Sequence, residues 1–256
     1  MTDVVCDLDG VIYRGDTQIP GAAEGLQQLL SAGVNLLFVT NNSTRTPKDV
    51  AEKIRAVTGI QTEAGQVVTS SQAAASMLSP EEGAALVVGE HGIREALSDR
   101  KIEITVSPES AHSVVVGLSR DLSYGLLADA VEAVRNGARF VATNTDPTFP
   151  TAEGLAPGAG SIVAAIATAA DKEPEVAGKP YEAMRSLVRA KVGADVWVVG
   201  DRVDTDIKMG SVEPSWRSVL VLSGVTAAGD AGDLPDHVVP DFKTAANLVL
   251  EGGHPR

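Results

Sequence analysis

The first residues whose types could support chemistry lie near the amino terminus, in the sequence Asp7-Leu8-Asp9-Gly10. They follow a short apolar run, and the two-residue period of a strand sends Asp7 and Asp9 to the same side. Two carboxylates this close repel each other unless a cation or a shared proton lies between them. An EF-hand calcium loop fits poorly, because the acidic residue expected further along is missing. The pair therefore belongs to a cation or acid–base site, or simply caps the next turn.

A second group of carboxylates follows the apolar run 196–200 and contains Asp201, Asp204 and Asp206. Helix capping and the helix dipole explain one or two acidic residues at such a position. Three are better explained by a hard cation that takes oxygen ligands.

Possible anion-binding groups occur at two further places. Thr40, Asn41 and Asn42 follow the apolar run 36–39, where hydroxyl, amide and backbone N–H groups can hold phosphate oxygens. Lys179 lies in a short loop before a proline. Taken alone, asparagine is a common turn former and a lone lysine is usually a solvated surface charge. Their combination with the carboxylates is what makes them candidates for a binding site.

Together these groups form the set that phosphoryl transfer requires. One carboxylate can act as nucleophile, and a neighbouring carboxylic acid can protonate the leaving group. Hydrogen-bond donors and a lysine can bind the phosphoryl oxygens, while further carboxylates hold a metal. The sequence contains no Walker A loop ending in Lys-Ser or Lys-Thr, so P-loop NTPase chemistry does not explain the set.

The elements that must position these residues alternate between short apolar strands and helical patterns, which indicates βαβ units and a largely parallel sheet. In open α/β sheets the ligand binds at the carboxyl ends of the strands. The predicted strands are residues 4–7, 35–40, 66–69, 85–89, 113–117, 139–143, 196–200 and 218–222, and the predicted helices are residues 21–31, 47–57, 122–136 and 160–170.

Two polar stretches that contain proline, residues 79–83 and 171–174, interrupt this alternation. The run between them has the length and the elements of a small domain. We therefore predict an inserted domain, after which the chain returns to the first sheet.

Charge and cysteine content exclude several classes of protein. The formal net charge of −13 over 256 residues argues against nucleic acid and anionic membranes as partners. A bound cation still allows a phosphorylated substrate. The single cysteine, Cys6, excludes an internal disulfide framework, and we expect it to be buried. No basic, apolar leader precedes the first strand and no apolar stretch is long enough to span a bilayer, so we expect a cytoplasmic protein.

Four segments resemble, in their order, the motifs of the haloacid dehalogenase-superfamily phosphatases: DLDGVIYRGD, VTNNSTRTP, the lysine of VAGKP, and VGDRVDTDI. The tyrosine and glycine of DGVIYRG and the run NTDPTFPTAEGLAPGAG are similar to the NagD-like branch in particular. The resemblance covers essentially the whole chain. It implies an α/β fold with a Rossmann-like, doubly wound and mostly parallel core formed by residues 1–79 and 175–256. A smaller α/β cap, residues 80–174, would be inserted between the second and third motifs.

The same resemblance implies a magnesium-dependent phosphomonoesterase. Asp7 would be the nucleophile that forms an aspartyl-phosphate, and Asp9 would protonate the leaving group and later activate water. The cation Mg²⁺ would be held by the Asp7 carboxylate, the Asp9 backbone carbonyl and Asp201. The residues that would bind the phosphoryl group are Thr40, Asn41, Asn42 and Lys179. Asp206 would support the metal site from behind, the role of Asp204 stays open, and a homodimer through the cap is suggested.

Other functions share parts of this constellation. A dehalogenase also uses an aspartate nucleophile, but it needs neither a second aspartate nor a metal, so Asp9 and Asp201 weigh against it. A phosphotransferase or phosphomutase shares the whole set and differs only in the acceptor. A non-catalytic sugar-phosphate-binding protein would not need every catalytic position to be filled by a competent residue, as it is here.

The expected substrate class follows from an absence. Residues 140–171 contain no lysine or arginine, although they include the proline-rich loop that should face the active site. A leaving group with a carboxylate or a second phosphate would need a cationic partner there. We therefore expect a polyol phosphate, sugar phosphate or nucleoside monophosphate, unless basic residues from elsewhere serve the site.

Overall fold

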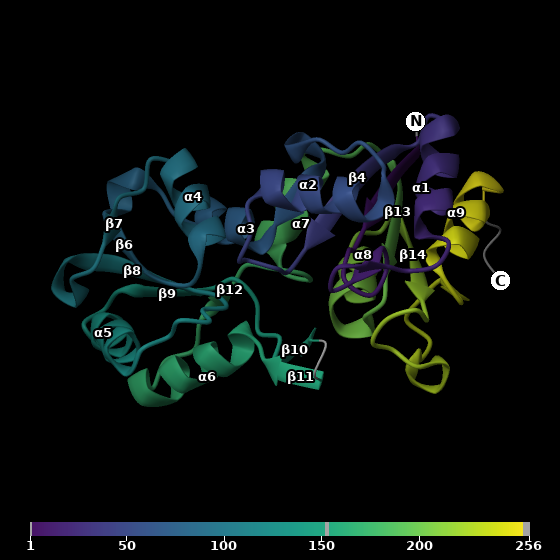
Figure 1. The fold of residues 1–256 in the computed structure, drawn as a ribbon. Helices are drawn as coiled ribbons and strands as arrows, with labels where there is room; N and C mark the ends of the chain where they lie inside the picture. Colours follow the sequence, from purple (N-terminus) through teal and green to yellow (C-terminus); the bar gives the residue numbers. More distant parts are fainter. Residues whose placement is uncertain (1, 152–153, 253–256) are drawn as a thin grey trace. The chain divides into compact units, whose positions relative to one another are not determined.

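The computed structural model describes residues 2–151 and 154–252. By its internal contacts the chain divides into two compact units, whose elements are labelled in Figure 1. The first unit comprises Met1–Thr40, Pro47–Val68 and Arg185–Arg256, and the second comprises Asn41–Thr46 and Thr69–Met184.

These units differ from the domain boundaries drawn from the sequence, because residues 41–46, 69–79 and 175–184 lie with the second unit. Hydrogen bonds join these segments to one another, and Asn144 Nδ2 joins them to the rest of the second unit by donating to the Asn41 oxygen. Ser70 Oγ donates to the backbone oxygen of Asn41 at 2.6 Å. The backbone N–H of Lys179 donates to Asn41 Oδ1 at 2.8 Å. The functional division into a catalytic core and a cap stays a prediction.

The sheet of the first unit has the strand order β15-β14-β13-β1-β4-β5. Strand β1 pairs in parallel with β13 and β4, and β13, β14 and β15 also pair in parallel. The bounds are β1 Thr2–Cys6, β4 Asn35–Thr40, β5 Val67–Thr69, β13 Asp195–Gly200, β14 Trp216–Val221 and β15 His237–Val239. A small hairpin, β2 (Tyr13–Arg14) and β3 (Thr17–Gln18), follows β1.

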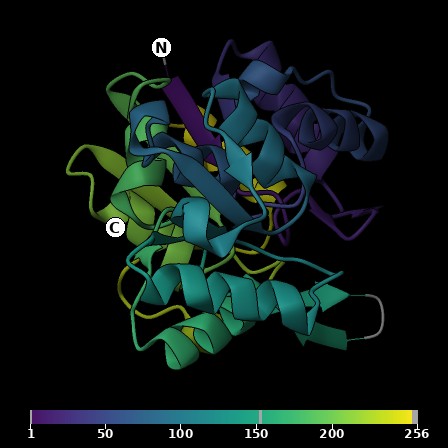
Figure 2. The same cartoon turned by 90° about the vertical axis from the view of Figure 1, so that its left-hand side faces the viewer.

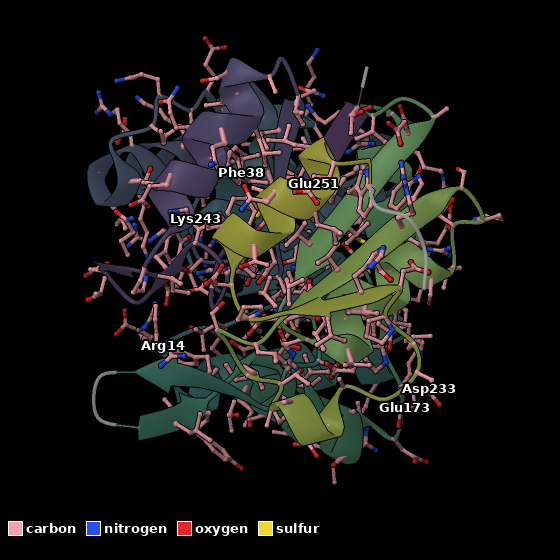
Figure 3. The ribbon with its side chains drawn as sticks, turned by 90° about the vertical axis from the view of Figure 1, so that its right-hand side faces the viewer. Arg14, Phe38, Glu173, Asp233, Lys243 and Glu251 are labelled. Atoms are coloured by element: carbon pink, nitrogen blue, oxygen red, sulfur yellow. The ribbon has the colours of Figure 1, made fainter. Side chains whose placement is uncertain are left out.

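Helices supply the rest of the first core. They are α1 Ala22–Ser31, α2 Pro47–Thr58, α8 Lys208–Ser211 and α9 Phe242–Leu250. Phe38 and Trp197 are fully buried within this core, and Cys6 is buried as expected. Helices α1 and α9 pack closely at Gly25, which has no side chain. A Cβ there would lie only 2.9 Å from the Phe242 ring. Figure 3 shows the side chains of this unit, with Phe38 labelled.

The second unit contains its own parallel sheet, with the strand order β12-β9-β8-β6-β7. Helices α5 and α6 lie side by side against one face of it, and α4 lies on the other (Figures 1 and 2). The strands are β6 Ala84–Val88, β7 Ile104–Thr105, β8 Ala111–Val116, β9 Arg139–Ala142 and β12 Glu175–Val176, with an antiparallel hairpin of β10 Thr148–Thr151 and β11 Gly154–Pro157. The helices are α3 Ser70–Ser76, α4 His91–Asp99, α5 Tyr124–Arg135 and α6 Ala159–Ala170, and α7 Glu182–Arg189 leads back to the first unit.

The predicted α/β fold with mostly parallel sheets and a Rossmann-like core is confirmed. All eight predicted strands and all four predicted helices are present, with no end shifted by more than two residues. The strands outside the prediction are short, such as the two-residue β7 and β12, which are too brief to show a periodic pattern, whereas the further helices include the nine-residue α4 and α9. In the described part of the chain, none of the helices combines the length and the apolar character that a membrane span needs.

A bidentate ion pair ties the edge strand β12 to β9. Arg139 Nε donates to Glu175 Oε1 at 2.7 Å and Nη2 donates to Oε2 at 2.8 Å. Arg139 also donates to the backbone oxygen of Met77. The hydrogen bonds from Arg139 hold the pKa of Glu175 below its usual range.

We expect Glu175→Gln to lower the free energy of unfolding at pH 7 by about 0.5–1 kcal/mol, since both partners are partly exposed. The lowered pKa means that the folded state favours the carboxylate. The stabilisation is therefore present above the pKa of the unfolded chain and is lost as the pH falls through the folded one. Urea unfolding should show a constant difference between pH 7 and 5 that shrinks below about pH 4.

The matched control is Glu173→Gln, which makes the same charge change at an exposed side chain (labelled in Figure 3) that has no ion pair in the described part of the chain. A Glu175→Gln difference no larger than that of the control, or one that grows in acid, would contradict this assignment.

Candidate active site

The parallel pairing of β1 and β13 brings two acidic segments to one edge of the first unit's sheet. Cys6 pairs with Val199 in the register, and the backbone N–H of Asp7 donates to the Val199 oxygen at 2.9 Å. Asp7 therefore follows directly on β1, and Asp201 follows directly on β13. Both carboxylates lie at the carboxyl ends of central parallel strands, as the sequence predicts.

Asp7, Asp201 and Asp206 form an acidic cluster, in which one carboxylate oxygen from each lies within 4.8 Å of the others. Asp201 and Asp206 are only 1 % exposed. Three carboxylates this close, two of them buried, repel each other strongly unless a cation or protons compensate their charge. An all-oxygen set of carboxylates fits a hard divalent cation such as magnesium.

The backbone after β13 is shaped around Asp206. A Cβ on Gly200 would lie 2.1 Å from the Asp206 Cβ, so only glycine allows this approach. The chain from Val203 to Ile207 forms a π-helical turn, and the backbone N–H of Arg202 donates to Asp206 Oδ2 at 3.1 Å. Asp206 is thereby turned inward, into the acidic cluster.

Asp204 belongs to a different environment. Its side chain is 69 % exposed and pairs with Arg202, whose Nη2 lies 2.9 Å from Asp204 Oδ2. The hydrogen bonds from Arg202 hold the pKa of Asp204 below its usual range. Among the described residues, the acidic cluster includes neither Asp204 nor the side chain of Asp9.

Asp9 and Gly10 form a tight turn after β1. Asp9 bridges to Tyr13, and the backbone N–H of Gly10 donates to the Tyr13 oxygen at 2.8 Å. Gly10 has a φ of 89°, in the left-handed region that favours glycine. The turn places the backbone of Gly10 against the side chain of Asp201. A Cβ on Gly10 would lie only 2.3 Å from Asp201 Oδ2.

Asn41 and Lys179, two predicted phosphate-binding residues, meet in the second unit. The backbone N–H of Lys179 donates to Asn41 Oδ1 at 2.8 Å, and Asn41 Nδ2 contacts the Lys179 oxygen at 3.4 Å. A Cβ on Gly178 would lie 2.5 Å from Asn41 Oδ1, so the glycine before Lys179 permits this contact. The side chain of Asn41 thus positions the backbone of the lysine loop.

The neighbouring candidates also make local contacts. Asn42 Oδ1 accepts hydrogen bonds from the backbone N–H and the hydroxyl of Thr44, at 2.9 and 2.8 Å. Thr40 is the buried last residue of β4. Asn144, in the loop that lacks lysine and arginine, donates from Nδ2 to the Asn41 oxygen at 2.7 Å.

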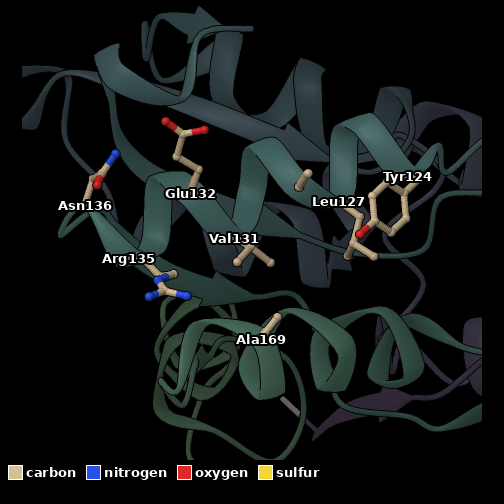
Figure 4. Close-up of a pocket in the computed structure, with 8 residues that line it drawn as sticks. Tyr124, Leu127, Val131, Glu132, Arg135, Asn136 and Ala169 are labelled. Atoms are coloured by element: carbon tan, nitrogen blue, oxygen red, sulfur yellow. The ribbon is translucent and has the colours of Figure 1, made fainter.

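A groove of about 460 Å³ lies elsewhere in the second unit, between α5 and α6 (Figure 4). Its lining is largely apolar and consists of Tyr124, Leu127, Ala128, Val131, Glu132, Arg135, Asn136 and Ala169. None of the predicted catalytic or metal-binding residues contributes to this lining.

Comparison with protein families gives two matches along the chain. The model of the haloacid dehalogenase-like hydrolases matches residues 4–103, and that of the HAD-hydrolase-like proteins matches residues 176–245. The first match contains Asp7 and Asp9, and the second contains Lys179, Asp201 and Asp206.

Similar proteins are known under several names. The 5'-nucleotidase YutF of Bacillus subtilis is 39 % identical over 248 residues, which covers 95 % of this chain and 93 % of that protein. The glycerol phosphate phosphatase Rv1692 of Mycobacterium tuberculosis, solved in complex with magnesium, has a TM-score of 0.87 and is 35 % identical. That alignment covers 96 % of this chain and 77 % of the other. NagD of E. coli has a TM-score of 0.82 at 31 % identity, covering 95 % and 98 % of the two chains.

The geometry predicts different roles for two aspartates that are two residues apart. We expect Asp206→Asn to weaken magnesium binding by about tenfold or more, because it changes a buried member of the acidic cluster. The matched control, Asp204→Asn, should change the affinity little, because that carboxylate pairs with Arg202 at the surface. Isothermal titration with magnesium measures both, and equal losses in the two variants would contradict the assignment.

Proposed function

The chain belongs to the haloacid dehalogenase-like hydrolases, and from this membership we propose that it is a magnesium-dependent phosphatase of the NagD-like branch, which hydrolyses small phosphomonoesters through Asp7. The observation that carries the proposal is the acidic cluster of Asp7, Asp201 and Asp206 at the carboxyl edge of the first sheet. The cluster supplies a nucleophile and a cation site in one place, which is the arrangement that phosphoryl transfer requires.

The cation site fits magnesium by the chemistry of its donors, which are all carboxylate oxygens. We propose that Asp7 and Asp201 hold the ion together with the backbone carbonyl of Asp9, and that Asp206 supports them. When bound, magnesium neutralises charge on the transferring phosphoryl group and on the carboxylates around it.

The proposed reaction proceeds in two steps, which Asp7 and Asp9 carry out. In the first, an Asp7 carboxylate oxygen forms a bond to phosphorus, the bond from phosphorus to the ester oxygen breaks, and Asp9 gives its proton to the leaving oxygen. In the second, Asp9 takes a proton from water as the water oxygen attacks phosphorus. The bond to Asp7 then breaks, and inorganic phosphate leaves with both aspartates restored.

We assign the binding of the phosphoryl oxygens to Thr40, Asn41, Asn42 and Lys179. The contacts within the second unit refine this assignment for Asn41, whose side chain holds the backbone of Lys179. Its contribution would therefore come from its backbone N–H and from fixing the lysine loop. Lys179 itself is 4 % exposed, which limits its side chain to few conformations.

The proposed substrate class is a polyol phosphate, sugar phosphate or nucleoside monophosphate. The names of a 5'-nucleotidase and a glycerol phosphate phosphatase among the relatives support a neutral, hydroxyl-rich leaving group. One basic residue does approach the loop that lacks lysine and arginine, since the Arg120 guanidinium lies 5.6 Å from the centre of the Phe149 ring. Arg120 Nη1 also donates to Glu90 at 2.7 Å, which partly neutralises its charge.

The test of the proposed function is a comparison of kcat/KM for glycerol phosphate, a nucleoside monophosphate and phosphoglycolate, with release of inorganic phosphate as the product. A preference for phosphoglycolate would show that a cation such as Arg120 serves the leaving group. Transfer of phosphate to an added acceptor without release would favour the phosphotransferase alternative.

Homodimer formation through the cap, a cytoplasmic location and the lack of nucleic-acid or membrane partners stay predictions.

The first prediction of the mechanism concerns Asp7. Asp7→Asn keeps the shape but removes the attacking charge and one metal ligand, so kcat should fall by several orders of magnitude. Chelation by EDTA should likewise abolish activity, and magnesium should restore it better than calcium, whose longer bonds misplace the attack. A variant with about a tenth of the wild-type kcat would contradict the nucleophile assignment.

Asp9 should respond differently, because proton transfer matters most when the leaving group is a poor one. Asp9→Asn should therefore slow the hydrolysis of an alkyl phosphate much more than that of an activated aryl phosphate. Steady-state kinetics on glycerol phosphate and p-nitrophenyl phosphate measure this difference. Equal losses on the two substrates would remove Asp9 from the acid–base role.

A further inference from the structure

The loop after β14, residues 222–226, is joined to the turn after Asp9 by two side chains of the first unit. Ser223 Oγ donates to the backbone oxygen of Gly10 at 2.8 Å. Arg14 Nη2, on the hairpin that follows this turn, donates to the backbone oxygen of Ser223 at 2.8 Å. Arg14 is exposed and is labelled in Figure 3. The two segments are more than 200 residues apart in the sequence, and these bonds join them.

Between the same two segments lies the carboxylate of Asp201. A Cβ on Gly10 would be 2.3 Å from Asp201 Oδ2, and a Cβ on Gly224 would be 1.9 Å from the same atom. The backbone N–H of Val225 donates to Asp201 Oδ2 at 2.7 Å. The carboxylate therefore fills a slot whose two walls are glycine backbone, and the Ser223 hydroxyl links one wall to the other.

The fixed position of the Asp201 carboxylate in this slot bears on which cation the acidic cluster can bind. Magnesium requires near-ideal octahedral geometry with short bonds, whereas calcium accepts longer bonds and variable coordination. A carboxylate held on both sides by backbone keeps its position and orientation relative to Asp7, which precedes Gly10 by three residues. If the walls could separate, Asp201 would gain freedom that magnesium tolerates poorly.

We propose that Ser223 is a positioning residue of the magnesium site, which sets cation affinity and selectivity by holding the Gly10 turn against the loop that contains Gly224 and Val225. Ser223 acts through Asp201 and touches neither substrate nor cation. Arg14 supports it from outside by fixing the backbone of the same loop. The proposal rests on the proposed function, which supplies the cation.

The test is isothermal titration of the full-length protein with magnesium and, separately, with calcium, in the absence of substrate. Ser223→Ala should weaken magnesium binding by about tenfold and calcium binding by clearly less. Ser223→Thr keeps the hydroxyl and should bind magnesium more nearly like the wild type. The matched control is Ser211→Ala, which removes an exposed hydroxyl that donates to the Lys208 oxygen at 3.1 Å, also in the first unit. It should leave both affinities unchanged.

A folded Ser223→Ala protein with wild-type magnesium affinity would overturn the proposal, and so would equal losses for magnesium and calcium. Should Ser223→Ala fail to fold, Arg14→Gln decides, because Arg14 is exposed and its loss removes only the outer bond. That variant should bind magnesium about two- to threefold more weakly, because it loses one exposed hydrogen bond, which lies at the low end of what a net hydrogen bond contributes. Wild-type affinity would contradict the proposal.

The titration needs no turnover, so the two claims can fail separately. A wild-type protein that binds magnesium in a Ser223-dependent way but releases no phosphate from any phosphomonoester would contradict the proposed function alone. Phosphatase activity together with the same magnesium affinity in the wild type and in Ser223→Ala would contradict the positioning role alone. A wild-type protein that binds no magnesium would contradict both.

Discussion

The mutual repulsion of three carboxylates is the constraint on which the rest of the first unit depends. One carboxylate oxygen from each of Asp7, Asp201 and Asp206 lies within 4.8 Å of the others, and Asp201 and Asp206 are almost fully buried. Such an arrangement costs stability in the absence of a cation, because like charges that are buried together repel each other. In the proposed site, magnesium bound to the folded state would offset this cost and would stabilise the fold by mass action. With the proposed roles of nucleophile and metal ligands, the same three side chains would couple folding to catalysis.

The backbone around the cluster is built to hold these charges in place. Gly10, Gly200 and Gly224 each occupy a position where a Cβ would lie within 2.3 Å of an aspartate side-chain atom. Glycine generally lowers stability by the freedom it gives the unfolded chain. At these three positions the absence of a side chain lets the backbone approach a carboxylate closely. The backbone N–H groups of Arg202 and Val225 donate hydrogen bonds to Asp206 and Asp201 respectively.

The sequence alone predicts much of this arrangement, for a physical reason. Apolar runs that end in aspartate indicate buried parallel strands, and the carboxyl ends of such strands meet at one edge of the sheet. The sequence therefore predicts that Asp7 and Asp201 lie close together. The distinction between Asp204 and Asp206 was available only from the resemblance to known phosphatases, because their different environments depend on a π-helical turn that no local pattern predicts. The contact between Asn41 and Lys179 joins residues 138 positions apart, and Ser223 follows a strand where serine is an ordinary turn residue. Long-range hydrogen bonds of this kind leave no periodic signal, although the place of Ser223, two residues beyond β14 at the carboxyl edge, was a signal that could have been used.

The most direct measurement of the central claim is chemical identification of the residue that carries the phosphoryl group. Enzyme mixed with magnesium and a fast substrate such as p-nitrophenyl phosphate is quenched in acid within milliseconds and treated with borohydride, which reduces an acyl phosphate to an alcohol. Peptide mapping by mass spectrometry should then find position 7 converted from aspartate to homoserine, and only in samples that contained both magnesium and substrate. Phosphate release without conversion of Asp7, or conversion of a different residue, would contradict the account of Asp7 as the nucleophile at the centre of the acidic cluster.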